Sequence, residues 1–100
     1  MPGFAENGGQ FEVHCSGAIA RSLKDLQKQA TLEGRGEQVL KAIQQTWHRL
    51  VHEPFEFGEP LYRLPAMRMQ VRHGAVLPLF VDFAVCEDRP LVFIKGVKLL

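Results

Sequence analysis

The sequence contains few cysteines, no large excess of either charge and no long apolar run. Its 100 residues include two cysteines, Cys15 and Cys86, and neither belongs to a CxxC motif or a Cys/His metal-ligand spacing. We therefore interpret both as reduced thiols, buried in or beside strands. No apolar run is long enough to span a bilayer. The N-terminus lacks the basic and apolar regions of a secretory signal. These absences predict a cytoplasmic protein with no membrane partner.

The nearly balanced charge excludes a global attraction to nucleic acid. Twelve Lys and Arg stand against eleven Asp and Glu, which gives a formal net charge of +1. A contact with nucleic acid would therefore depend on a local cluster of cations. One such cluster exists, because Arg63, Arg68, Arg72 and His73 lie in a stretch without acidic residues, 60–81.

Length and composition are those of one globular domain. The apolar fraction is 46% and the charged fraction is 23%, both ordinary for a folded protein of 100 residues. A chain of this size can bury one hydrophobic core without disulfide bonds. Residues 1–10 are rich in glycine and small or polar side chains, so we expect a flexible N-terminal tail. Residues 11–100 then form a single domain.

The first half of the chain predicts a strand followed by two helices. Phe11, Val13 and Cys15 alternate with polar residues, which is typical of a half-buried strand, and Ser16 is a candidate N-cap for the helix that follows. Apolar residues then recur at helical spacing over 18–32 and 37–52, with a glycine-containing break between the two segments. The two expected apolar faces are Ile19, Leu23, Leu26 and Ala30, and Val39, Leu40, Ile43, Trp47, Leu50 and Val51.

The second half predicts three strands. Residues 67–71 alternate apolar and polar side chains, and 72–75, with sequence RHGA, are suited to a turn. Residues 77–85 form a longer alternating run, and 87–90 are suited to a second turn. The last run, 91–100, is nearly continuous in apolar residues, which favours a central strand or one covered on both faces.

These elements predict an α+β fold with the order β-α-α-β-β-β. Short connections join the last three strands, so they form an antiparallel meander, and the first strand joins the same sheet. We expect a helical hairpin packed on one face of a mainly antiparallel, four-stranded sheet.

The order of elements and four sequence segments together resemble the RelE/ParE superfamily of type II toxin–antitoxin toxins. FEVHCSGAIARSLKDL, 11–26, resembles the first strand and helix of that family, and PFEFGEPL, 54–61, resembles its Pro-x-x-x-Gly-x-x-Leu passage. YRLPAMRMQV, 62–71, is similar to its arginine-bearing strand, and VFIKGVK, 92–98, to its closing strand.

The resemblance implies a concave sheet surface with the helical hairpin on the other side. In the RelE branch this surface binds and cleaves ribosome-bound messenger RNA without a metal ion or cofactor. In the ParE branch the target is a protein, DNA gyrase. Both kinds are held inactive by an antitoxin, which is therefore an expected partner.

The resemblance also implies which residues act on the target. Arg68 and Lys98 match the family's basic positions and are the candidate catalytic residues, because cations stabilise the charge of a phosphorane. We assign target binding to four further residues. These are Arg63, Arg72, His73 and Lys95.

Two departures from the family pattern leave catalysis open. Val97 stands where a histidine often occurs, and the sequence ends at Leu100 without the family's late tyrosine. If active, the protein would be a metal-independent endoribonuclease with an incomplete catalytic set. The alternative is a catalytically inactive protein-interaction module of the same fold, which binds a partner or forms a homo-oligomer. We expect no metal site, because His48 and His52 have helical spacing but no third ligand.

Overall fold

A computed structural model describes residues 10–100 of the chain. Residues 1–9, which make up most of the predicted tail, lie outside the described residues. The elements in chain order are β1 (Glu12–Cys15), α1 (Gly17–Leu32), α2 (Gly36–His52), β2 (Glu59–Leu64), a 3-10 turn (Pro65–Met67), β3 (Met69–Val76), β4 (Leu79–Cys86) and β5 (Leu91–Leu99). Neither of the two helices in this part of the chain combines the length and apolar character needed to cross a membrane.

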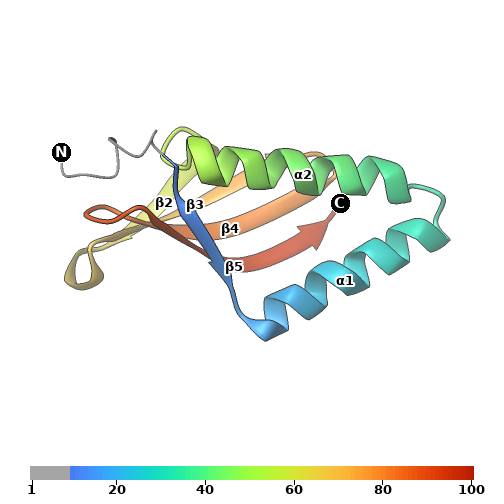
Figure 1. The fold of residues 1–100 in the computed structure, drawn as a ribbon, viewed down its shortest axis with the longest axis horizontal. Helices are drawn as coiled ribbons and strands as arrows, with labels where there is room; N and C mark the ends of the chain where they lie inside the picture. The colour runs from blue at the N-terminus through green and yellow to red at the C-terminus, as the bar shows by residue number, and fades with distance from the viewer. Residues whose placement is uncertain (1–9) are drawn as a thin grey trace.

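The fold is α+β, with two helices packed on one face of a five-stranded mixed sheet (Figure 1). The strand order is β1-β5-β4-β3-β2, and β1 runs parallel to β5 while the other neighbours are antiparallel. The prediction of four strands was wrong, because β2 adds a fifth at the edge. Only Leu64 of β2 is even half-buried, so this strand lacks the alternation by which half-buried strands are recognised.

The main core lies between α2 and the sheet. Leu50 of α2 is fully buried there, in contact with apolar side chains from β1, β4 and β5 and from the segment after α2. The buried members of this cluster are Phe11, Leu50, Phe57, Val81, Phe83, Val85, Val92 and Ile94. The helix-side face of the sheet is therefore the covered face.

The extents of both helices were predicted correctly, but some of the side chains predicted to be buried are exposed. Ser16 caps α1 as expected, because its side-chain oxygen accepts a hydrogen bond from the backbone N–H of Ile19 at 3.2 Å. In α2 the buried stripe is rotated from the expected one, so Leu40 and Trp47 remain 39% and 38% exposed. The residues that α2 buries are Val39, Ala42, Thr46 and Leu50.

The β3–β4 hairpin turns later than the sequence suggested. The predicted turn, 72–75, lies inside β3, and the chain turns at Leu77 and Pro78. Gly74 does not form a turn. It allows the ring of Phe57 to pack directly on the backbone of β3, since a Cβ at this position would lie 2.7 Å from that ring. The predicted strand 67–71 also begins later, because Arg68 has a left-handed backbone with φ of 51°.

The burial of one cysteine differs from its prediction, whereas the last strand meets the first of its two predicted alternatives. Cys86 is buried, but Cys15 is exposed, and both thiols are free. The last strand, β5, is central, between β1 and β4, and it is covered on one face only, because Val92 is fully buried while Phe93 is 36% exposed. The sequence of β5 is nearly continuous in apolar residues because its uncovered face, like its covered face, carries an apolar side chain, here an aromatic one.

We call the sheet surface opposite the helices the open face. At one end it carries a small apolar cluster, Met69, Val71, Ala84 and Cys86. Strand pairing continues this face to His73, Phe80, Asp82 and Lys98 at the other end, and across β5 to Glu12, His14 and Phe93. The fold therefore presents polar and aromatic side chains on a surface that no helix covers.

Candidate functional site

A histidine and an aspartate face each other on the open face of the β3–β4 hairpin. His73 of β3 is the direct partner of Asp82 of β4 in the strand register. The imidazole Nδ1 and the carboxylate Oδ1 lie 2.5 Å apart, and the two side chains are 42% and 50% exposed. The pair is thus held in short contact while remaining open to solvent.

A shallow pocket of about 210 Å³ surrounds this pair and includes Lys98 of β5. Lys98 is exposed and lies opposite Phe80 in the register, while Gly96 lies opposite Asp82. A Cβ at Gly96 would be 3.9 Å from Asp82 Oδ2, so the glycine leaves the carboxylate side of the pocket open. The pocket therefore combines an imidazole, a carboxylate and an ammonium group.

Phe80 fixes the orientation of the imidazole. Its ring stacks on that of His73, with centroids 5.8 Å apart and an angle of 16° between the planes. The ring and the carboxylate together restrict the rotamer of His73. Such restriction is what allows a side chain to act at a defined point in space.

Arg72, which the sequence assigned to target binding, anchors β3 beside the pocket. It lies on the covered face with 6% of its surface exposed. Its Nε donates to the Phe57 carbonyl oxygen at 3.1 Å and its Nη2 to that of Gly58 at 3.0 Å. Burial lowers the pKa of Arg72 from its ordinary value. This residue binds the chain's own loop and is not available to a target.

Two other predicted arginines are engaged at the far end of the sheet. Arg63 forms two hydrogen bonds of 2.6 Å with Glu87, and this contact raises the pKa of Arg63 and lowers the pKa of Glu87. Arg68 lies 3.5 Å from Asp88, and its carbonyl oxygen accepts from the N–H of Glu87, just beyond the end of β4.

The structure does not bring the two candidate catalytic residues together. Lys98 pairs with Phe80 near the start of β4, whereas Arg68 lies beyond the last residue of that strand. The length of β4 separates them by roughly 20 Å. Lys95 is exposed on β5 next to Gly96, but only Lys98 and His73 of the six predicted residues line the pocket.

The pocket has the groups required for proton transfer next to an anion. When Nδ1 carries the imidazole proton, Asp82 accepts its hydrogen bond and Nε2 presents a lone pair, the arrangement of an oriented general base. Within residues 10–100, no salt bridge involves Lys98, so its charge is available to an incoming anion.

Asp82 and Phe80 were missed as site residues because the hairpin register was misplaced. With a two-residue turn at Leu77 and Pro78, positions 73 and 82 are equally distant from the turn and must pair. Placing the turn at 72–75 removed His73 from the strand. The residues between Val71 and Leu77 do not alternate in polarity, so periodicity alone does not extend the strand up to the turn.

Metal binding has no support in the part of the chain that the structure describes. No group of three or more His, Cys, Asp or Glu side chains there is placed to hold an ion. The rings of His48 and His52 lie 4.4 Å apart on α2 without a third ligand from these residue types.

Comparisons with protein-family models, curated proteins and solved structures found no match.

Proposed function

We propose that this chain is a RelE/ParE-like toxin of a toxin–antitoxin pair, acting in the cytoplasm on ribosome-bound messenger RNA. The observation that carries the proposal is the pocket formed by His73, Asp82 and Lys98 on the open face. It supplies a base and a cation where the sequence alone lacked a complete catalytic set. The helices on one face and the exposed sheet on the other agree with the expected arrangement of such a toxin.

The proposed reaction is cleavage of RNA without a metal ion. His73 Nε2 takes the proton of a ribose 2′-OH, and the resulting oxygen attacks the adjacent phosphorus. Lys98 stabilises the added negative charge of the phosphorane. The bond from phosphorus to the 5′-oxygen then breaks, and this oxygen takes a proton from solvent. The products are a 2′,3′-cyclic phosphate and a 5′-hydroxyl end.

A second function, binding of a protein target or of an antitoxin without catalysis, is favoured by a different observation. Arg63 and Arg68 are paired with Glu87 and Asp88, and Arg72 is buried. Of the predicted basic residues only Lys95 and Lys98 are exposed without an ion pair among residues 10–100. Weak electrostatics suit a protein partner better than an extended RNA duplex.

Induced expression in bacteria, with primer extension on cellular messenger RNA, tests the proposal. We expect growth arrest and new 5′ ends with the wild-type chain. His73→Ala should reduce cleavage by about 100-fold or more, as for loss of a general base. Lys98→Ala should also abolish arrest. Arg68→Ala is the matched control, since it removes one cation outside the pocket, and it should retain full activity.

Three results would contradict the proposal. The pocket is not the active site if arrest and cleavage survive both His73→Ala and Lys98→Ala at equal protein levels. Growth arrest without any new RNA ends would indicate a protein target. Absence of arrest at every expression level would leave the non-catalytic binding module as the function.

A further inference from the structure

The open face carries a second group in which a histidine contacts a carboxylate and stacks on a phenylalanine, as in the pocket, but without a lysine. His14 and Glu12 of β1 lie beside Phe93 of β5, just as His73 and Asp82 lie beside Phe80. We infer that Glu12, His14 and Phe93 form a base-stacking subsite for a nucleotide flanking the cleaved bond. The inference rests on the proposed function, because it adds a substrate-positioning site to the same face.

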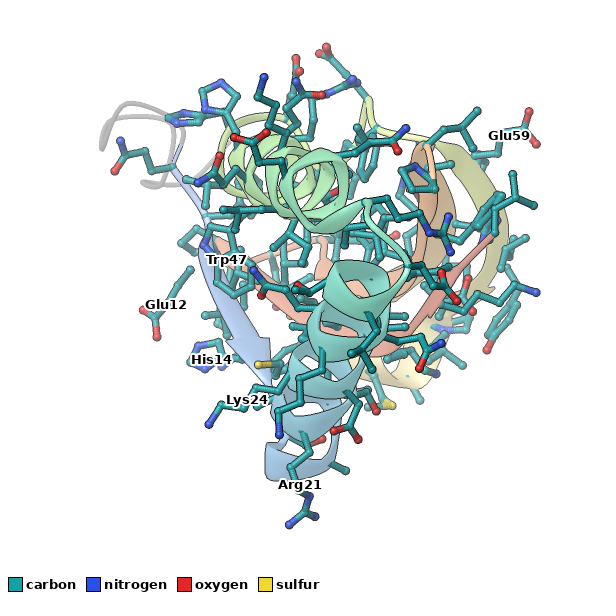
Figure 2. All side chains as sticks on the ribbon, turned by 90° about the vertical axis from the view of Figure 1, so that its right-hand side faces the viewer. Glu12, His14, Arg21, Lys24, Trp47 and Glu59 are labelled. Carbon is teal, nitrogen blue, oxygen red and sulfur yellow. The ribbon has the colours of Figure 1, made fainter. Side chains whose placement is uncertain are left out.

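The second group is ordered and accessible. His14 Nε2 lies 2.7 Å from Glu12 Oε1, and the two side chains are 45% and 70% exposed. The rings of His14 and Phe93 are stacked, with centroids 5.5 Å apart and 24° between their planes. Figure 2 shows Glu12 and His14 extending together from β1 away from the helices. An incoming planar base would thus meet aromatic rings whose orientation is already fixed by their contacts with each other and with Glu12.

Small residues connect the two groups across the sheet. Phe93 lies opposite Ala84 in the register, and Gly96 lies opposite Asp82. Ala84 carries only a methyl group and Gly96 has no side chain, so neither projects far above the sheet between the two aromatic positions. At these two positions no long side chain separates the two groups.

The spacing of the two groups suits a short single strand. Ala84, the partner of Phe93, is four residues from Phe80 along β4. This offset, with one strand-to-strand step, places Phe93 and Phe80 roughly 14 Å apart. Single-stranded nucleic acids cover comparable distances within the few-nucleotide site sizes typical of sheet surfaces with aromatic stacking positions.

The chemistry of this path favours single-stranded RNA over a duplex. Stacking on aromatic rings needs unpaired bases, and it supplies affinity without many cations. The open face offers phenylalanine and histidine rings but few lysines near them, so it cannot track the dense phosphates of a duplex. The subsite would therefore bind the π-face of a base by stacking and would make little contact with the phosphate charges.

Binding of a labelled, fully 2′-O-methylated single-stranded RNA, measured by fluorescence anisotropy, tests the subsite independently of cleavage. Phe93→Leu keeps apolar volume but removes the ring, and His14→Ala removes its stacking partner. Each should weaken binding about tenfold, the usual effect of losing one base stack. Phe55→Ala is the matched control, because Phe55 is 37% exposed, like Phe93 at 36%, but packs against Phe11 of the main core.

Cleavage kinetics of an unmodified messenger RNA bound to ribosomes separate this inference from the proposed function. We expect Phe93→Leu to raise KM with kcat unchanged, whereas His73→Ala lowers kcat. Unchanged affinity and KM in both Phe93→Leu and His14→Ala, with wild-type cleavage intact, would overturn the subsite alone. Binding that depends on Phe93 in a wild-type protein that does not cleave would support the subsite and refute the proposed reaction. No binding by the wild-type protein would overturn the subsite.

Discussion

Gly58 and Arg72 together fix the strand that carries His73. Gly58 has a φ of +70°, and a Cβ there would lie 2.1 Å from the carbonyl oxygen of His73. This close approach lets the Gly58 carbonyl accept from the buried Arg72 guanidinium. The glycine of the Pro-x-x-x-Gly-x-x-Leu passage is therefore required by the structure, because it allows the loop after α2 to lie against β3.

Gly58→Ala should destabilise the protein more than the replacement of a glycine whose only requirement is a positive φ. A methyl group would be forced against the β3 backbone, so we expect a loss of about 2–4 kcal/mol in the free energy of unfolding. Gly34→Ala is the control, since Gly34 has a φ of +78° but no atom within 4 Å of the place that an added methyl group would take. It should lose only about 1 kcal/mol. Urea unfolding measures both, and equal losses would show that the contact with His73 does not matter.

The two helices contribute unequally to the fold. Of the α1 residues only Ala30 is buried, whereas α2 buries a full stripe against the sheet. Lysines and arginines of α1, such as Arg21 and Lys24, extend away from the body of the protein (Figure 2). Because burial of apolar area is the main stabilising contribution, α1 depends on few contacts for its position.

Truncation of matched leucines tests this difference between helices. Leu50→Ala in α2 removes a fully buried side chain and should cost about 3–5 kcal/mol. Leu23→Ala in α1 removes a half-buried one and should cost about 1 kcal/mol. Chemical denaturation gives both values, and amide exchange should be faster in α1 than in β4. Similar losses for the two variants would mean that α1 is packed as firmly as α2.

Elements with local signals were predictable from the sequence, and those that depend on pairing were not. The Ser16 cap and both helices follow from short-range patterns, and the structure confirms them. The exposed edge strand β2 has no such pattern. The turn of the β3–β4 hairpin was misread at Gly74, a glycine required by the ring of Phe57. That one error hid the His73–Asp82 pair, because register decides which side chains meet.

For the whole molecule, a net charge of +1 and the small number of lysines on the open face limit how RNA can be held in the proposed complex. Arginines that would supply long-range attraction are instead used within the chain, on Glu87, Asp88 and the loop at Gly58. The proposed complex must then depend on stacking and on at most two lysines. A ribosome-bound substrate suits this, because the ribosome itself would hold the message in place.

The affinity for RNA should depend only weakly on salt, because the proposed complex uses stacking and at most two lysines. If only Lys95 and Lys98 meet phosphates, the slope of log K against log[salt] for a single strand should be about −1.4. Anisotropy titrations with the 2′-O-methylated RNA between low and physiological salt measure it, and Lys98→Ala should bring the slope to about −0.7. A slope of about −3 or steeper would require further cations. Cations elsewhere on the surface, such as Arg21 and Lys24 of α1, would then have to take part, and the open face alone would not be the binding surface.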